Sequence, residues 1–141
     1  MSVVDDAIAK LQDHVLACTT VTIRDAPDYP VNDAGILPIA LAHLVSGSGQ
    51  ADTADQTRLL LTANVDVHFN QNIIKDAYQK IDKIAVEYLK RLAGDPTLGG
   101  TVDTIIYPVE FTVTPTQWNA VATQMISFTV NFKELTTPIA P

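Results

Sequence analysis

The sequence predicts an α+β domain in which two helices pack on a mainly antiparallel sheet of about four to five strands, with a long β-hairpin arm. Apolar residues recur every three or four positions over residues 3–18 and 70–92, the period of a helix with one buried face. Apolar and polar residues alternate over 57–69, 102–113 and 125–133, the period of a strand. All 141 residues are predicted to form one domain, because this length supports a single core.

The helix predicted over residues 70–92 organises the rest of the fold. Asn70 or Asn72 can cap its start, and Gly94 can end it. An isolated helix of this length is marginal in water, so its apolar stripe must lie on an apolar surface, which the strands provide. The stripe consists of eight residues: Ile74, Ala77, Tyr78, Ile81, Ile84, Ala85, Tyr88 and Leu92.

The N-terminal segments are predicted from similar patterns. Residues 3–18 form the first helix, and Cys18 continues its apolar stripe as a small buried hydrophobe. Thr19–Arg24 is rich in β-branched residues, which favours a short strand. Residues 25–35 contain two prolines and three aspartates, and they predict a loop whose carboxylates lack the ligand spacing of a calcium site.

Residues 36–45 form an apolar run without a polar face, which is typical of a strand buried on both sides. Two helices are too few to cover both faces of a sheet, and Pro38 places this strand at an edge or a bulge. We therefore expect a second chain to cover one face, although a bend within the run is the alternative. The candidate subunit interface consists of Ile36, Ala40, Ala42 and Leu44.

Residues 46–56 are small and polar and predict a flexible tip between the two strands of the hairpin. The tip is either an unconstrained surface loop or an arm that orders against a neighbouring protein. Trp118 is expected on a single helical turn, where it covers the end of the sheet or contacts a partner. Residues 135–141 are expected to form an extended tail. The candidate arm and docking contacts are Gly47, Gly49, Gln50, Asp52, Asp55 and Trp118.

The charge distribution bears on possible partners. The formal net charge is −7, and five of the nine basic residues lie within 70–92. Elsewhere, four basic residues face thirteen acidic ones. A protein that grips nucleic acid through phosphates needs the opposite balance, so specific DNA binding is not expected, whereas DNA passing nearby is compatible with this charge.

The sequence predicts neither an enzyme nor a cofactor or metal site. His14, His43 and His68 lie in three different elements without metal-ligand spacing. Cys18 has no base nearby in sequence, and no GxSxG motif is present. No apolar run approaches the length of a membrane span, and the acidic N-terminal residues do not resemble a secretion signal.

One stretch carries a likeness to a known family. YLKRLAGDPTLGGTVDTI, residues 88–105, runs from a helix through a turn into a strand, and the strands IIYPVEFTV and ISFTVNF follow it. Together with the order of elements, the length of 141 residues and the acidic balance, this segment resembles the tail terminator (tail completion) proteins of long-tailed bacteriophages.

The resemblance implies a tail-terminator-like domain whose copies form a homo-oligomeric ring, expected to be a hexamer. Such a ring caps the finished tail tube, ends its polymerisation and offers a docking surface for the head. The implied partners are the tail tube protein and a head completion or connector protein, and DNA would pass through the lumen without specific binding. The implied location is the virion tail or neck, assembled in the host cytoplasm. The alternatives are another neck, connector or tail tube component, or a small cellular ligand-binding domain.

Overall fold

The computed structural model describes residues 3–24, 26, 37–53, 56–71, 73–118 and 120–136. Within these residues the chain forms two helices and four antiparallel strands, which confirms the predicted α+β class. In chain order the elements are α1 (Val3–Leu16), β1 (Ile39–Thr53), β2 (Gln56–Asn70), α2 (Ile74–Ala93), β3 (Thr104–Trp118) and β4 (Val121–Thr136).

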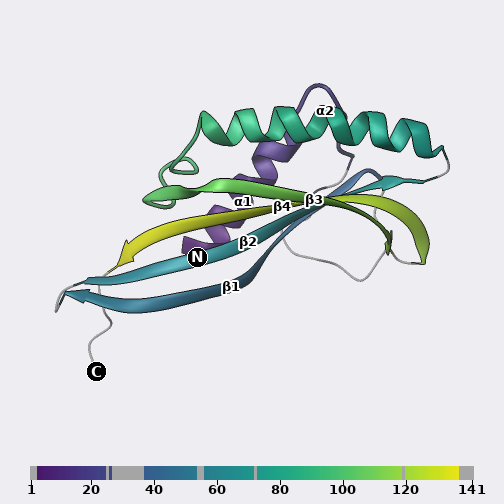
Figure 1. Ribbon diagram of the computed structural model, residues 1–141. Helices are drawn as coiled ribbons and strands as arrows, with labels where there is room; N and C mark the ends of the chain where they lie inside the picture. The colour runs from purple at the N-terminus through teal and green to yellow at the C-terminus, as the bar shows by residue number, and fades with distance from the viewer. Residues whose placement is uncertain are drawn as a thin grey trace.

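The four strands form one twisted sheet in the order β1-β2-β4-β3 (Figure 1). The central strands β2 and β4 are paired from Thr57 opposite Thr136 to Asn70 opposite Thr123. Because side chains alternate between the two faces of a sheet, this register gathers the apolar series of both strands on one face. β1 and β3 are the edge strands.

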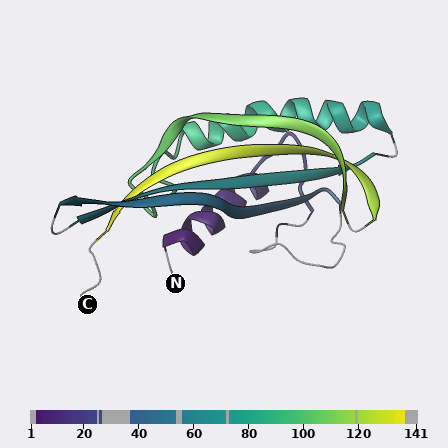
Figure 2. The same cartoon turned by 60° about the horizontal axis from the view of Figure 1, so that its bottom comes forward.

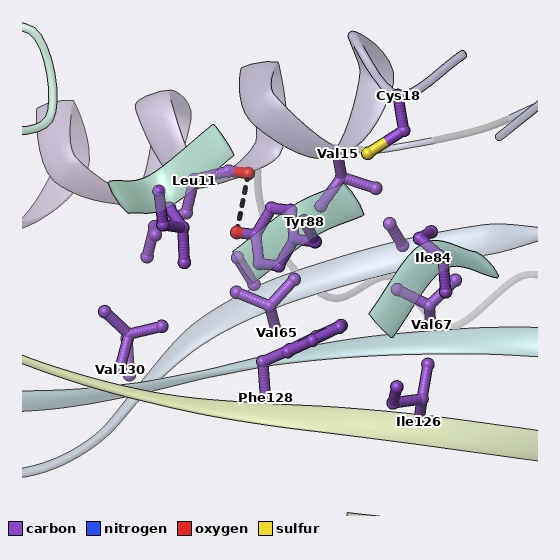
Figure 3. Close-up of a cluster of buried hydrophobic side chains, with 14 of the residues drawn as sticks. Leu11, Val15, Cys18, Val65, Val67, Ile84, Tyr88, Ile126, Phe128 and Val130 are labelled. Atoms are coloured by element: carbon purple, nitrogen blue, oxygen red, sulfur yellow. Dashed lines mark hydrogen bonds between the residues drawn. The ribbon is translucent and has the colours of Figure 1, made fainter. Parts of the chain in front are cut away.

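Both helices cover that apolar face, and the core lies between them and the sheet (Figures 1 and 2). Tyr88 is fully buried, and its hydroxyl donates a hydrogen bond to the main-chain carbonyl of Leu11 at 3.0 Å (Figure 3). The ring of Tyr88 lies against that of Phe128, with 4.7 Å between the ring centroids. Within the predicted stripe of α2, Ile74 and Tyr78 are exposed, and the other six residues are buried: Ala77, Ile81, Ile84, Ala85, Tyr88 and Leu92.

The structure shows that two of the four predicted interface residues, Ala40 and Ala42, are not available to a second chain. Ala40 and Ala42 lie in the core of the subunit itself, and the side-chain amide of Gln12 in α1 donates a hydrogen bond to the carbonyl of Ala40 at 3.1 Å. Ile39 and Leu41, on the opposite face of β1, are also buried. Leu44 is 43% exposed because the core ends before it, and Ile36 lies outside the described residues.

The flexible tip predicted over residues 46–56 is also wrong, because most of this segment is strand. β1 continues to Thr53, and β2 begins at Gln56. A Cβ atom added to Gly47 would come within 2.6 Å of Leu61 Cδ2, so this glycine permits close packing on β2. The long hairpin arm is not confirmed, because β4 runs beside β2 up to Thr136 and the hairpin is part of the sheet.

Three local predictions also differ from the structure. Residues 19–24 form bends and irregular chain instead of a strand. Residues 114–118 continue β3 instead of forming a helical turn. α2 begins at Ile74 after Ile73, without a side-chain cap, and Asn72 lies outside the described residues. In the first two cases contacts with distant parts of the chain outweigh the local preference, because Glu87 binds the backbone of residues 19–20 and β4 pairs with residues 114–118.

The predicted C-terminal tail is shorter than expected. Leu135 and Thr136 belong to β4, where they pair with Arg58 and Thr57. The backbone N–H of Leu135 also donates a hydrogen bond to the Asp103 carboxylate at 2.9 Å. Residues 137–141 lie outside the described residues. The first two residues of the predicted tail, Leu135 and Thr136, therefore extend the sheet.

Burial of Ala42 predicts a large effect on stability. Replacing it with aspartate places a charge in the core, so we expect Ala42→Asp to lower the free energy of unfolding by about 3 kcal/mol or more. The matched change Leu44→Asp, at an exposed position of the same strand, should cost less than about 1 kcal/mol. Urea denaturation measures both, and equal stability of the two variants would contradict the placement of Ala42.

Candidate interaction surfaces

A hollow of about 490 Å³ lies where the irregular segment after α1, the start of β1 and α2 come together. Three of its lining side chains are cationic, and among the described residues that line it there is no carboxylate. This concentration of positive charge contrasts with the net charge of −7. We call it the basic hollow; its lining residues are Thr20, Val21, Thr22, Arg24, Leu37, Pro38, Asn70, Lys80 and Lys83.

Glu87 of α2 holds one wall of the basic hollow in place. Its carboxylate accepts hydrogen bonds from the backbone N–H groups of Thr19 and Thr20, each at 2.8 Å, and from Arg91 Nε at 3.1 Å. Desolvation acts to raise the pKa of Glu87, but the hydrogen bonds from Thr20, Thr19 and Arg91 outweigh it and lower the pKa to about 2. The opposite wall is tied to β1 because the backbone N–H of Arg24 donates to the Pro38 carbonyl at 3.0 Å.

Two carboxylates lie at the far end of the sheet. Asp103 precedes β3 and Glu134 lies near the end of β4, and Arg58 and Lys133 lie at the same end, so this end carries both signs of charge. Desolvation, and then repulsion from Asp103, raise the pKa of Glu134. Glu134 pairs with Leu59, which is eleven residues along β2 from Asn70 in the basic hollow, or about 36 Å at the rise of a strand. Glu134 therefore lies far from the basic hollow.

The two edge strands differ in what they expose. β3 presents four large apolar side chains, with Tyr107 53% and Phe111 44% exposed. Pro108 and Pro115 remove backbone donors from this strand, so side-chain contacts are favoured over strand pairing there. The four residues, which we call the β3 surface, are Ile106, Tyr107, Phe111 and Val113. They do not share one face of the sheet, because Phe111 and Val113 pair with Phe128 and Ile126 on the helix side and Ile106 pairs with Asn131 on the other side.

The outer half of β1 offers a different edge. Its side chains from Ser46 to Ala51 are exposed, and they are small or polar. Among the described residues, β1 pairs with β2 on one side only, and no described strand pairs with its other side. The predicted contacts Gly47, Gly49 and Gln50 lie here, but the two glycines face Leu61 and Leu59 across the pair.

The remaining predicted contacts have mixed outcomes. Asp52 lies in β1, although its side chain is outside what the structure describes. Asp55 lies outside the described residues. Trp118 is the last residue of β3 and pairs with Val121, and its side chain is not described either. The structure therefore does not gather the predicted docking residues on one surface.

The face of the sheet opposite the helices carries a ladder of polar cross-strand pairs between β2 and β4. The hydroxyl of Thr62 donates to Asn131 Oδ1 at 2.6 Å, and the hydroxyl of Ser127 donates to Asp66 Oδ1 at 2.6 Å. Two further pairs, His68 with Thr123 and Asn64 with Thr129, continue the ladder. These polar groups satisfy one another, so the ladder stabilises strand pairing.

Buried titratable groups serve packing. Cys18 is buried as predicted, and desolvation, followed by the charge of Glu87, raises the pKa of its thiol to about 11, so it is protonated at neutral pH. Desolvation lowers the pKa of His68, against the opposing effect of Asp66. Among the described residues, no group of three or more His, Cys, Asp or Glu side chains is arranged to hold a metal ion.

The basic hollow and the β3 surface were not identified from the sequence. The five basic residues of residues 70–92 were apparent, but the sequence does not show that Lys80 and Lys83 lie beside Arg24. Phe111 and Val113 pair with Phe128 and Ile126 on the helix side of the sheet, yet they remain exposed at the β3 edge. Both surfaces result from contacts between distant segments.

Comparison of the chain with models of known protein families and with curated protein sequences gives no match. Neither described helix has the length and apolar character needed to cross a membrane.

The role of Glu87 predicts a pH-dependent stability. We expect Glu87→Gln to lower the free energy of unfolding by about 1–2 kcal/mol at pH 7, because the charged acceptor of several hydrogen bonds is lost. The pKa of Glu87 is lower in the folded state, about 2 against an ordinary 4.5, so its contribution is complete above pH 4.5 and declines as pH falls towards 2. The difference between wild type and variant should shrink over that window in urea denaturation.

The control for this measurement is Glu110→Gln, which changes an exposed carboxylate on β3. It should leave stability unchanged within about 0.5 kcal/mol at pH 7. A Glu87→Gln variant as stable as the wild type at pH 7 would contradict the role assigned to Glu87.

Proposed function

We propose that this protein is a structural virion protein whose copies form a ring that caps the tail tube, ends tube polymerisation and provides the docking surface for the head. The observation that carries the proposal is the open edge of the sheet, where the edge strand β3 exposes four large apolar side chains. Exposed apolar residues concentrated on an edge strand are typical of a surface that meets another protein. The exposed residues of β3 therefore support the proposal, whereas the apolar run near residue 40 does not, because it is buried within the subunit.

The two edges of the sheet are unlike, and this difference supports a ring over a two-fold dimer. The β1 edge offers small polar residues and has no second strand as neighbour among the described residues, whereas the β3 edge offers apolar side chains. A contact between two different surfaces of identical subunits repeats from one copy to the next, and it gives a ring when the rotation closes. A hexamer is the ring size that the likeness at residues 88–105 implies.

The proposed partners are the tail tube protein on one side of the ring and a head completion or connector protein on the other. The net charge of −7 suits a channel through which DNA passes without being held. In this proposal the protein is not an enzyme and needs no cofactor. It belongs to the tail or neck of the virion and is assembled in the host cytoplasm.

The first test measures assembly and capping together. Light scattering coupled to size exclusion should give the mass of a hexamer, and electron microscopy should show rings. Added to polymerising tail tube protein of the same phage, these rings should stop tube growth and appear at tube ends. Rings that do not stop growth would favour another neck or connector component. A monomer at high concentration that binds a small molecule would favour the cellular ligand-binding alternative.

A second test addresses the β3 surface. Val113→Asp places a charge on this surface, so we expect the ring to dissociate while the subunit stays folded, because a buried unpaired charge opposes association. The control is Val86→Asp, the same change at a 54% exposed position of α2 outside the β3 surface, which should leave the mass unchanged. Light scattering reports the mass, and circular dichroism reports the fold. A Val113→Asp variant that still assembles would exclude the β3 surface from the subunit contact.

A further inference from the structure

We infer that the basic hollow is a binding site for a small organic phosphate, whose phosphate group faces Arg24, Lys80 and Lys83 and whose apolar part lies against the apolar wall of the hollow. This site goes beyond the proposed ring, because every residue that forms it belongs to one subunit. Binding can therefore be measured whether or not the copies assemble.

The three cationic side chains reach the hollow from two separate parts of the chain. Lys80 and Lys83 are three residues apart in α2, so they lie on the same side of the helix. Arg24 belongs to the segment between α1 and β1, whose backbone is hydrogen-bonded to the Pro38 carbonyl. An ionised phosphate monoester carries about two negative charges at neutral pH and has three acceptor oxygens. It therefore matches this group of cations better than a singly charged carboxylate does.

Two carboxylates of α2 lie near the basic hollow, and neither lines it. Glu87 accepts hydrogen bonds from the backbone of residues 19–20 and from Arg91, so its charge is already compensated. Asp76 lines a neighbouring hollow of about 230 Å³ together with Lys80. Lys83 and Arg24 do not line that second hollow, so positive charge remains in excess in the first.

The apolar wall strengthens the attraction of this hollow for anions. It consists of Val21, which is buried, and of Leu37 and Pro38, which are partly buried. A cleft that has walls of low polarity and charges of one sign concentrates ions of the opposite sign. The volume of about 490 Å³ also lies within the range of small-molecule sites, and a largely apolar wall with a few polar groups is typical of them.

Both sides of the basic hollow are held in place by contacts that do not use its cationic side chains. The carboxylate of Glu87 ties residues 19–20 to α2, and the Pro38 carbonyl accepts the backbone N–H of Arg24. A site whose walls are already in position loses less conformational entropy when a ligand binds. The arrangement therefore favours a small ligand that enters a formed site.

The size of the cationic group favours one phosphate over a nucleic acid. A protein that binds a phosphate backbone presents basic residues along an extended surface. Here three cations line a single hollow, on a chain whose formal net charge is −7. An isolated phosphate group fits this arrangement, whereas a polyanionic strand would also meet the acidic surface around it.

Calorimetric titration with phenyl phosphate tests the site, because this probe joins one phosphate group to one apolar ring. The wild type should bind it saturably, with one equivalent per chain. The hollow variant Lys80→Gln/Lys83→Gln should bind at least about tenfold more weakly, since it loses charge-assisted hydrogen bonds. The matched control Lys75→Gln/Lys90→Gln removes the same charge from α2 outside the hollow, and its affinity should stay within about twofold of the wild type.

A second probe tests the preference for phosphate. Benzoate carries the same ring with a single negative charge, so the wild type should bind it at least about tenfold more weakly than phenyl phosphate. Circular dichroism and melting temperature establish that each variant is folded. Arg24→Gln changes the other side of the hollow and should also weaken phenyl phosphate binding, so it replaces the hollow variant if that one unfolds.

Three results would overturn the inference and leave the proposed ring intact: no saturable binding of phenyl phosphate, equal binding by the wild type and the hollow variant, or benzoate binding as tight as that of phenyl phosphate. Saturable binding by a monomeric wild type, lost in the hollow variant, would support the inference and contradict the ring.

The chain's own carboxylates are tested separately. Asp25, Asp28 and Asp33 lie outside the described residues, in the part of the sequence between Arg24 and Leu37. The variant Asp25→Asn/Asp28→Asn/Asp33→Asn should bind phenyl phosphate within about threefold of the wild type. A wild type that does not bind the probe, together with a variant that does, would assign the hollow to these carboxylates and overturn the inference.

Discussion

The burial of a single sheet face under both helices is the constraint on which the rest of this structure depends, and Tyr88 lies at its centre. Its ring contacts Phe128 in β4, and its hydroxyl donates a hydrogen bond to the carbonyl of Leu11 in α1, so one side chain joins α2 to two other elements (Figure 3). A buried hydroxyl is tolerated only when it is hydrogen-bonded, so this contact also sets the distance between the helices. Glu87, one position earlier in α2, then anchors the chain that leaves α1.

Because the helices cover one face and leave the edges of the sheet open, the available surfaces are unlike one another. The face opposite the helices carries polar cross-strand pairs that satisfy one another, such as Thr62 with Asn131. The β3 edge retains exposed apolar side chains, and three cationic side chains line the basic hollow. A structural protein that must join identical neighbours in one direction needs such asymmetry, since unlike sides distinguish a ring from a two-fold pair.

Features set by interactions within one segment could be predicted from the sequence, whereas features set by contacts between distant segments could not. The helices, the alternating strands of the core and the burial of Cys18 were predictable, because each depends on a period or a residue type within one segment. Residues 46–56 were predicted as a flexible tip because their glycines and serines are typical of linkers. In the structure, Gly47 lies against Leu61 on β2, where a larger residue would not fit. Composition alone does not distinguish these two uses of glycine.

The sequence by itself determined the α+β class, the apolar faces of the long helix and central strands, and the acidic balance, since periodicity and composition are properties of the chain before it folds. Only the tertiary structure decided that Ala40 and Ala42 lie beneath α1, and that Phe111 remains exposed at an uncovered edge. It also brought Arg24 beside Lys80. These outcomes depend on which segments, far apart in the sequence, come into contact. Each contact requires suitable residues on both segments, so the sequence of one segment alone does not specify it.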